Sequence, residues 1–319
     1  MAPWVDRGLM AMTDLVVGAS GLLGSAIRSE LSRRGHSTST VVVPWSDPEQ
    51  AARALDAAVW QTEGDLRIWW CAGSGVTSSS ADSFRRELHT LSAFFDSLAE
   101  RARREPGTLS LFFASSAGGL YAGSAEPPFT EFTAVQPLSA YGETKVAAEA
   151  MALDLTKLGV KVGIARIANL YGPAQNLAKP QGLISHLCLA HYTRRPLNIY
   201  VSLDTLRDYL YAPDAAAVCV DFMDALERSE HPCITKVVAS GRSVSIAELL
   251  ADMHLLFKRA VPFNLIASPA ATQQARDLRL RSLTLPELDQ RDLTTLVSGI
   301  HQTDLAIGQR FRAGLVARR

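Results

Sequence analysis

The sequence has few cysteines and no arrangement of histidines typical of a metal site. Its 319 residues include only four cysteines, Cys71, Cys188, Cys219 and Cys233, and no two of them form a CxxC motif. This pattern indicates a reduced, cytoplasmic chain rather than a disulfide-stabilised one. The seven histidines form neither HxxxH nor HExxH, so the sequence predicts no metal site.

Net charge and long apolar runs are also missing. Lys+Arg and Asp+Glu number 32 each, so the formal net charge is zero, and no overall attraction to nucleic acid or to an anionic membrane is expected. No apolar run reaches the length of a membrane span. Residues 1–12 lack the apolar segment of a secretory signal and are expected to form a short extension. The chain is therefore predicted to be cytoplasmic, without nucleic-acid or membrane partners.

What the sequence does contain is a regular alternation of apolar runs and amphipathic segments between residues 13 and 172. "DLVVGAS" and "LRIWWCAG" are typical of buried strands, and "PEQAARALDAAVW" is typical of a helix. Because the connections are too long for hairpins, we predict parallel βαβ units and an α/β, doubly wound Rossmann sheet. Residues 173–319 have a mixed pattern, which predicts a smaller substrate-binding lobe that returns some segments to the sheet.

A glycine motif follows the first predicted strand. "GASGLLG" has GxxGxxG spacing and lies between a strand and a helix, the context in which glycines let a pyrophosphate approach the backbone and a helix N-terminus. The alternative is a turn with a glycine that serves helix packing. The predicted cofactor-binding residues of this loop are Gly18, Ser20, Gly21, Leu22, Leu23 and Gly24.

The choice between NAD and NADP is left open by the second strand. An acidic residue at its tip would bind the adenosine ribose, but "TVVVPWSD" has none before Asp47, which follows Pro44. No arginine follows the strand to mark the 2′-phosphate of NADP. We expect NAD or NADP, with NAD slightly favoured.

A tyrosine and a lysine four residues apart occur in "PLSAYGETK". Ser139 precedes a helical pattern as an N-cap would, which places Tyr141 and Lys145 on one helix face. Ser115 and Ser116 end the strand "TLSLFFASSAG", at the edge where doubly wound sheets place their active sites. The alternatives are an exposed helical pair and a plain strand-to-loop transition.

Together these segments resemble the extended short-chain dehydrogenase/reductase family, in its NAD-dependent nucleotide-sugar epimerase/dehydratase branch. The resemblance runs from about Thr13 to past Ser282. The matching motifs, in the order of the family, are "GASGLLG", "FFASSAGGLYAGS", "PLSAYGETKVAAE", "RIANLYGPAQN" and "LRDYLYAPDAA".

The resemblance implies a role for each matching residue. Tyr141 would accept or donate the proton at the reacting sugar hydroxyl or carbonyl, and Lys145 would hold the nicotinamide ribose and assist by its charge. Ser116, or alternatively Ser115, would hydrogen-bond the same substrate oxygen. Asn169 and Arg207 would contact the nucleotide sugar, Arg207 at its diphosphate. A structural role is expected for Asp214.

Three departures from the family pattern bear on the reaction. Dehydratases of this branch carry an Asp-Glu pair after the hydroxyl residue, where this chain has Ala117-Gly118, so dehydration is disfavoured. Glu87 stands where many relatives have an asparagine. "WWCAGSG" replaces the more usual Ala-Ala end of the strand that faces the cofactor.

The leading hypothesis is an epimerase-type enzyme acting on a nucleotide-activated sugar. The alternative is a nucleotide-linked 4-keto-sugar reductase, and a less favoured one is a non-catalytic dinucleotide-sensing protein. Relatives commonly dimerise through the helix that carries the tyrosine, so a homodimer is an open expectation. Phe94 and Phe95 would serve either that interface or the core.

Overall fold

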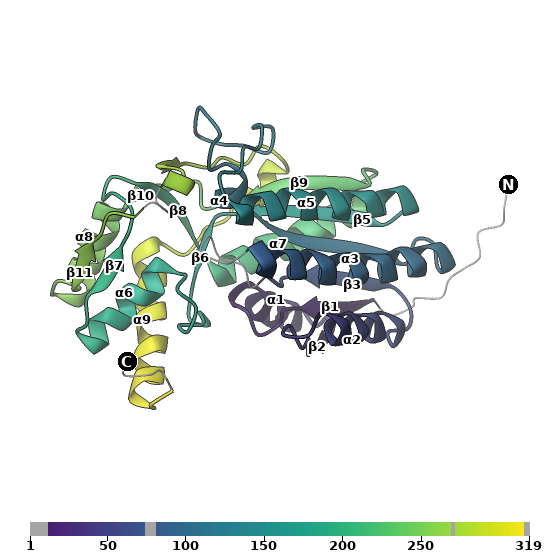
Figure 1. Cartoon of the computed structure of the whole chain (residues 1–319), viewed down its shortest axis with the longest axis horizontal. Helices are drawn as coiled ribbons and strands as arrows, with labels where there is room; N and C mark the ends of the chain where they lie inside the picture. Colours follow the sequence, from purple (N-terminus) through teal and green to yellow (C-terminus); the bar gives the residue numbers. More distant parts are fainter. Residues whose placement is uncertain (1–11, 74–80, 269–271, 316–319) are drawn as a thin grey trace.

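The computed structural model describes residues 12–73, 81–268 and 272–315. Most of the expected N-terminal extension, residues 1–11, lies outside this range. The chain forms a larger α/β part and a smaller mixed part, which lie side by side (Figure 1).

The larger part is built on one parallel sheet. Its strands are β1 (Thr13–Val17), β2 (Ser37–Val41), β3 (Leu66–Trp70), β4 (Leu109–Ser116), β5 (Lys161–Ile167) and β9 (Cys233–Val238). Their order is β2-β1-β3-β4-β5-β9, and every neighbouring pair is parallel. Because the strand order reverses direction between β1 and β3, a topological switch point lies at that place. The predicted doubly wound sheet is confirmed.

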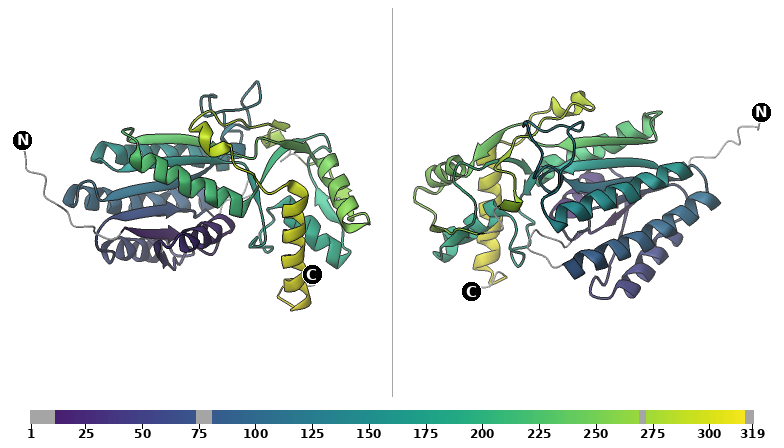
Figure 2. Two further views of the ribbon diagram at one scale, coloured as in Figure 1. Left: turned by 180° about the vertical axis from the view of Figure 1, so that it is seen from behind. Right: turned by 45° about the horizontal axis from the view of Figure 1, so that its top comes forward.

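Helices cover both faces of this sheet (Figure 2). One face carries α1 (Leu22–Arg33) and α7 (Ala212–Arg228); the other carries α2 (Pro48–Trp60), α3 (Ala81–Arg104) and α5 (Ala140–Asp154), which continues as the 3-10 helix Leu155–Leu158. Successive side chains of a strand point to opposite faces of the sheet. Because helices cover both faces, the strands are apolar throughout. In β4, Phe112 packs on the α1 and α7 side and Phe113 on the α3 and α5 side.

The two neighbouring phenylalanines of α3 belong to the core, which was one of the two roles expected for them. Phe94 and Phe95 are buried, and both rings contact the ring of Trp70 on β3. They therefore cannot form an exposed subunit interface.

Among the residues that the structure describes, the sheet has one strand, β2, outside β1. In the usual dinucleotide-binding order 3-2-1-4-5-6, a further strand lies outside that position. Here the chain runs from β2 through α2 directly into β3, so β2 is an edge strand. Val42, just after β2, is 92% exposed.

In the described residues, the smaller part contains two short sheets and three α-helices. Its strands are β6 (Asn169–Tyr171), β8 (Leu206–Tyr211), β10 (Ser243–Ser245) and β12 (Asp277–Leu278) in one sheet, with β7 (Leu197–Ile199) and β11 (Phe263–Leu265) in the other. Its helices are α6 (Leu183–Thr193), α8 (Ile246–Phe257) and α9 (Leu296–Arg312). Leu187, Leu249 and Ile300 lie at the centre of its apolar core. A 3-10 helix, Pro286–Asp289, packs against α7 of the larger part.

One predicted strand is divided between the two parts. The continuous apolar run "VKVGIARIANLYGP" is typical of a single strand, but it breaks at Ala168, whose N–H donates to the carbonyl of Val238. The first half is β5 of the main sheet, and the second half, β6, pairs with β8. An apolar run shows that a segment is buried but does not show which strand it pairs with. Among the described residues, no helix has the length and apolar character needed to cross a bilayer.

Candidate active site

The glycine loop packs closely against the end of β3. Gly18 has a φ of +84°, and a Cβ on it would lie 2.8 Å from the backbone nitrogen of Ala72. A Cβ on Gly24 would lie 2.2 Å from the Gly18 carbonyl oxygen. Only glycine fits at either position. Because α1 begins directly after Gly21 without a side-chain cap, its first N–H groups are available to an anion. The loop fits a dinucleotide pyrophosphate.

The tyrosine–lysine pair faces the end of β4. Ser139 caps α5, as predicted, by accepting a hydrogen bond from the Gly142 N–H at 3.3 Å. Lys145 is only 7% exposed; its Nζ donates to the Ala114 carbonyl at 3.5 Å and lies 5.9 Å from the centre of the Tyr141 ring. The pair therefore lies at the carboxyl edge of the sheet.

A short helix after β4 holds the tyrosine ring in place. In α4 (Ala117–Leu120), a Cβ on Gly119 would lie 2.9 Å from Cε1 of Tyr141. A Cβ on Gly142 would lie 2.2 Å from the Gly119 carbonyl oxygen. The two helices can approach this closely only because both positions are glycine. Phe84 of α3 also packs on the Tyr141 ring, with centroids 6.3 Å apart. Gly119 was not predicted as a site residue from the sequence, although it lies three residues after the end of β4.

The two serines of β4 have different surroundings. The Ser116 hydroxyl accepts a hydrogen bond from the Gly119 N–H at 3.2 Å and so caps α4. Ser115 is 5% exposed, and its Oγ has no hydrogen-bond partner among the described residues. Alternation along β4 puts Ser115 on the same face as Phe113, whose ring centre lies 5.6 Å from the Lys145 Nζ. Ser115 therefore shares the face of the sheet that carries the pair.

A buried ion pair anchors the helix that carries the pair. Arg166 of β5 donates to both carboxylate oxygens of Glu149, at 3.2 and 2.8 Å, and to the hydroxyl of Tyr121 at 2.9 Å. Burial by itself lowers the pKa of Arg166, but the hydrogen bonds to Glu149 raise it overall. Glu149 lies one turn after Lys145, so this contact fixes the helix against the sheet.

The residues expected to bind substrate lie on the strands next to this edge. Asn169 follows β5 closely, and its Nδ2 donates to the Asp208 carbonyl at 3.1 Å. Arg207 of β8 is 8% exposed, and its Nη1 donates to the carbonyls of Leu206 at 2.9 Å and Ala275 at 2.7 Å. Burial lowers the pKa of Arg207, and among the described residues no carboxylate forms an ion pair with it. Arg207 is thus a buried cation held by neutral groups.

Two further acidic residues have structural roles. Asp214 accepts hydrogen bonds from the N–H and hydroxyl of Thr294, at 2.7 and 3.1 Å, which agrees with the structural role expected for it. Asp47 caps α2 by accepting from the N–H groups of Glu49 and Gln50, at 3.0 and 3.1 Å. The acid nearest to the tip of β2 is therefore engaged as a helix cap.

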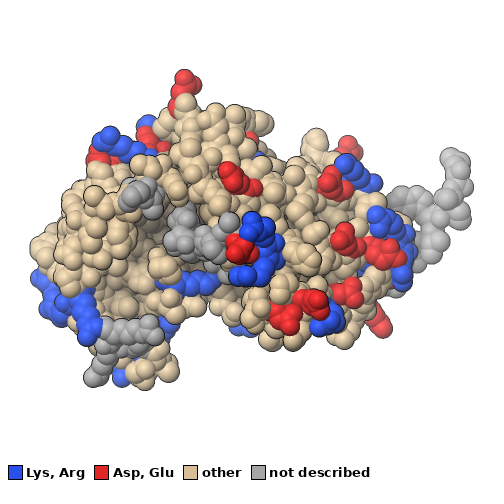
Figure 3. Space-filling model, in the orientation of Figure 1, with Lys and Arg blue, Asp and Glu red and all other residues tan. Residues whose placement is uncertain are grey.

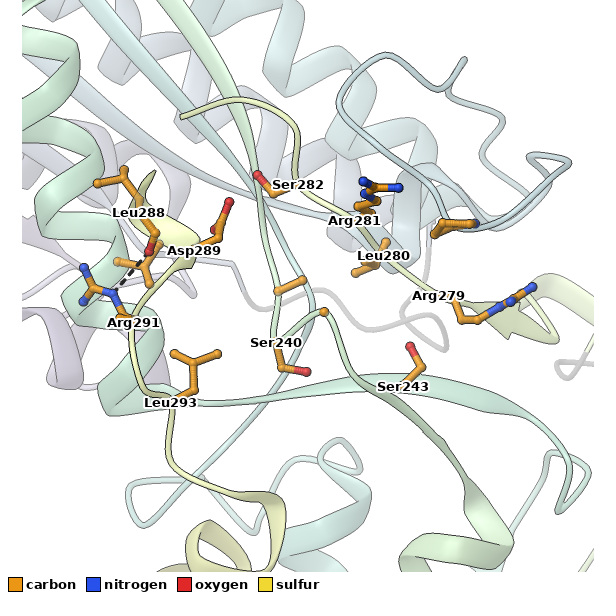
Figure 4. A pocket seen from close by; sticks show the side chains of 14 residues that line it. Ser240, Ser243, Arg279, Leu280, Arg281, Ser282, Leu288, Asp289, Arg291 and Leu293 are labelled. Carbon is orange, nitrogen blue, oxygen red and sulfur yellow. Dashed lines mark hydrogen bonds between the residues drawn. The ribbon is translucent and has the colours of Figure 1, made fainter. Parts of the chain in front are cut away.

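A separate cavity of about 480 Å³ lies beside the turn that follows β9 (Figure 4). Its wall combines the turn after β9 with residues 279–293, and none of Tyr141, Lys145, Asn169 and Arg207 lines it. Figure 4 shows Arg291 on one side of the cavity and Arg279 and Arg281 on the other. Charges of both signs are mixed over the face drawn in Figure 3, which is hollowed between the two parts. No metal-binding cluster occurs among the residues that the structure describes.

Comparisons with known proteins identify the family of the chain. The family described as "NAD dependent epimerase/dehydratase family" matches residues 15–237. The dTDP-4-dehydro-6-deoxyglucose reductase of Escherichia coli is 33% identical over 149 residues, which are 46% of this chain and 46% of that protein. A UDP-glucuronate 4-epimerase of Thermodesulfobacterium geofontis is 33% identical over 104 residues, which are 32% of this chain and 31% of that protein. The matched segments thus span less than half of either relative.

Solved structures share the fold. The chain covers 99% of the UDP-glucose 4-epimerase of Thermus thermophilus, solved with NAD, over 93% of its own length. The TM-score is 0.76 at 20% identity. At this identity the likeness establishes the architecture, and it agrees with the Rossmann-type sheet expected from the sequence.

Proposed function

The chain belongs to the NAD dependent epimerase/dehydratase family, and from this premise we propose that it is an NAD(P)-dependent, epimerase-type enzyme acting on a nucleotide-activated sugar. The observation that carries the proposal is the position of Tyr141 and Lys145. They face the serine-bearing end of β4, on the same edge of the sheet as the glycine loop.

The residues present fit a dinucleotide cofactor. The close approach of Gly18 to Ala72 and of Gly24 to Gly18 leaves backbone N–H groups at the start of α1 for the pyrophosphate. Lys145 would hold the ribose on the nicotinamide side. When bound, the cofactor supplies an acceptor and donor of hydride. The sequence favours NAD slightly over NADP, and Asp47, being a helix cap, adds no ribose ligand at β2.

The proton is handled by the protein. Tyr141, as the tyrosinate, takes the proton of the reacting sugar hydroxyl, and the nearby ammonium of Lys145 stabilises the negative phenolate oxygen. A serine hydroxyl donates a hydrogen bond to the same sugar oxygen. The sequence favoured Ser116, but Ser116 caps α4, whereas the Ser115 hydroxyl lacks a partner among the described residues. We therefore assign this role to Ser115.

The substrate is proposed to be held by its diphosphate. Arg207 is buried without a carboxylate partner among the described residues. A buried cation in this condition is stabilised by an anionic ligand, and guanidinium binds phosphate oxygens in a bidentate manner. Asn169, on the adjacent strand β6, would contact the sugar. Both named relatives are, by their names, enzymes of nucleotide sugars.

A 4-keto-sugar reductase is the second candidate. The relative from Escherichia coli carries this activity in its name and matches nearly half of the chain. The same residues serve both reactions, since the tyrosine would here give its proton to the sugar carbonyl. The two functions differ in whether reduced cofactor is consumed.

A screen of nucleotide sugars tests the proposal. Purified protein is incubated with individual UDP- and dTDP-sugars and their 4-keto forms, with NAD+, NADP+, NADH or NADPH supplied separately, and products are separated by chromatography and mass spectrometry. An epimer formed without net cofactor consumption supports the epimerase, and one equivalent of reduced cofactor consumed per product supports the reductase. Cofactor binding without turnover of any sugar would favour a dinucleotide-sensing protein instead.

We also propose that the protein is a cytoplasmic homodimer. Leu153 of α5 is an exposed apolar side chain on the helix that carries the tyrosine, and relatives commonly associate through this helix. Sedimentation equilibrium of the wild type and of Leu153→Glu provides the test. A monomeric wild type would exclude the dimer.

A further inference from the structure

An acidic side chain lies beside the catalytic lysine. A Cβ on Gly73, which follows β3, would lie 3.5 Å from the Glu87 Oε1 and 3.6 Å from the Lys145 Nζ. The carboxylate of α3 and the ammonium of α5 therefore border the same small space at the end of β3. The sequence comparison with the family singled out Glu87 as a departure, because many relatives have a neutral asparagine there.

Glu87 occupies the inward face of α3. Phe84, one turn before it, packs on the Tyr141 ring, and Leu91, one turn after it, is buried in the core. Residues three and four apart share a helix face, so Glu87 lies on the face of α3 that is turned toward α5, where its side chain is partly buried. The adjacent Arg85 and Arg86 are exposed. A partly buried acidic group on an inward helix face is uncommon unless it has a charged neighbour or a function.

This space lies on the path of the cofactor. Gly18 of the pyrophosphate loop packs against Ala72, the residue before Gly73. A dinucleotide that places its pyrophosphate at this loop extends across the switch point, from β1 past β3 toward β4. Its nicotinamide half then reaches the region bordered by Glu87, Lys145 and Tyr141. This step rests on the proposed function.

We propose that Glu87 sets the preference of this site for the oxidised cofactor. The oxidised nicotinamide ring carries a positive charge and the reduced ring carries none. A carboxylate beside it favours the cation, and it also offsets the charge of Lys145, which disfavours the cation. With a neutral residue at position 87, the charge of Lys145 is not offset and disfavours the oxidised ring. Glu87 thereby shifts the balance between the two forms of the bound cofactor toward the oxidised one.

The test measures binding rather than turnover. Dissociation constants of the full-length protein are determined for NADH by its fluorescence and for NAD+ by competition, and likewise for NADPH and NADP+; the pair bound more tightly by the wild type is used. In Glu87→Gln we expect the ratio of the oxidised to the reduced dissociation constant to rise roughly tenfold. In Glu87→Asp, which keeps the charge, the ratio should stay near the wild-type value.

Matched variants separate the charge from other effects. Asp96→Asn removes one negative charge from the exposed side of the same helix and should leave the ratio unchanged. Glu87→Asn is a second neutral variant in case Glu87→Gln does not fold, as judged by circular dichroism. An unchanged ratio in the neutral variants, or an equal change of both constants, overturns the inference and leaves the proposed function standing. If the wild type binds no form of either dinucleotide, the proposed function fails first and the inference fails with it.

Discussion

At the scale of single residues, the site depends on which atoms face the edge of the sheet. Tyr141 and Lys145 follow from their spacing on one helix. The serine does not follow from spacing, because two adjacent residues of a strand point to opposite faces. Ser115 and Ser116 therefore have different surroundings although they differ little in sequence context.

The first prediction concerns the tyrosine. Tyr141→Phe removes the group that exchanges a proton but keeps the ring that packs on Gly119 and Phe84. We expect kcat to fall about 10²- to 10⁴-fold, with cofactor dissociation constants within about threefold of wild type. Steady-state kinetics and fluorescence titration measure the two quantities. Full activity in the variant would exclude the proton-transfer role.

The second prediction compares the two serines. Ser115→Ala removes a hydroxyl that has no partner among the described residues, so it should lower kcat at least tenfold and leave stability nearly unchanged. Ser116→Ala removes a helix cap, so it should cost about 1 kcal/mol of unfolding free energy and change kcat little. Denaturant unfolding and initial rates are measured on both. The reverse pattern would return the catalytic role to Ser116.

At the scale of secondary-structure elements, the site is assembled by close contacts between α4, α5 and β5. The Glu149–Arg166 pair fixes α5 on the sheet, and the glycines at positions 119 and 142 let α4 touch it. These contacts set the position of the tyrosine ring before any ligand arrives, which is the preorganisation that catalysis requires.

The third prediction tests the contact between α4 and α5. Gly119→Ala places a methyl group 2.9 Å from Cε1 of Tyr141, closer than unbonded carbon atoms approach, so the ring must move. Because small misplacements of reacting groups are costly, we expect kcat to fall at least tenfold. Gly118→Ala is the matched control, since its methyl group would meet only the end of the Leu278 side chain, at 3.3 Å. Equal rates in the two variants would contradict this account.

At the scale of the whole molecule, one buried acid links the two parts. Asp208 of β8 accepts a hydrogen bond from the Ser240 N–H, in the turn after β9, at 2.8 Å. Its second oxygen has no partner among the described residues. Burial raises the pKa of Asp208 to about 6, against the opposing effect of the hydrogen bonds from Ser240.

The fourth prediction follows from that pKa. The folded protein holds this proton more tightly than the unfolded chain does. This difference in proton binding stabilises the folded state. The stabilisation is complete below the unfolded-state pKa of the carboxyl group, and it is lost as the pH rises through about 6. Its size is on the order of 3 kcal/mol. Asp208→Asn should remove this component, so that between pH 4 and 6 the stability of the variant rises relative to wild type.

Thermal or urea unfolding at several pH values provides the measurement. Asp96→Asn, which changes an exposed acid, should keep the pH dependence of the wild type. Parallel stability curves for Asp208→Asn and wild type over this range would show that Asp208 titrates normally.

The sequence by itself determined the doubly wound sheet, the glycine loop and the tyrosine–lysine pair. Each of these is a local pattern: alternating strand and helix signals, glycines at a strand-to-helix turn, and two side chains one helical turn apart. Family membership followed from the order of such patterns along the chain. Local patterns are readable because each depends on residues only a few positions apart.

How distant segments meet could be seen only in the folded molecule. The tertiary structure divided one apolar run between β5 and β6, placed Phe94 in the core, and brought Glu87 of α3 to the same space as Lys145 of α5. It also left Arg207 buried without an acidic partner among the described residues. Strand pairing, burial and convergence of charges depend on residues far apart in the chain, and their packing is a property of the folded molecule.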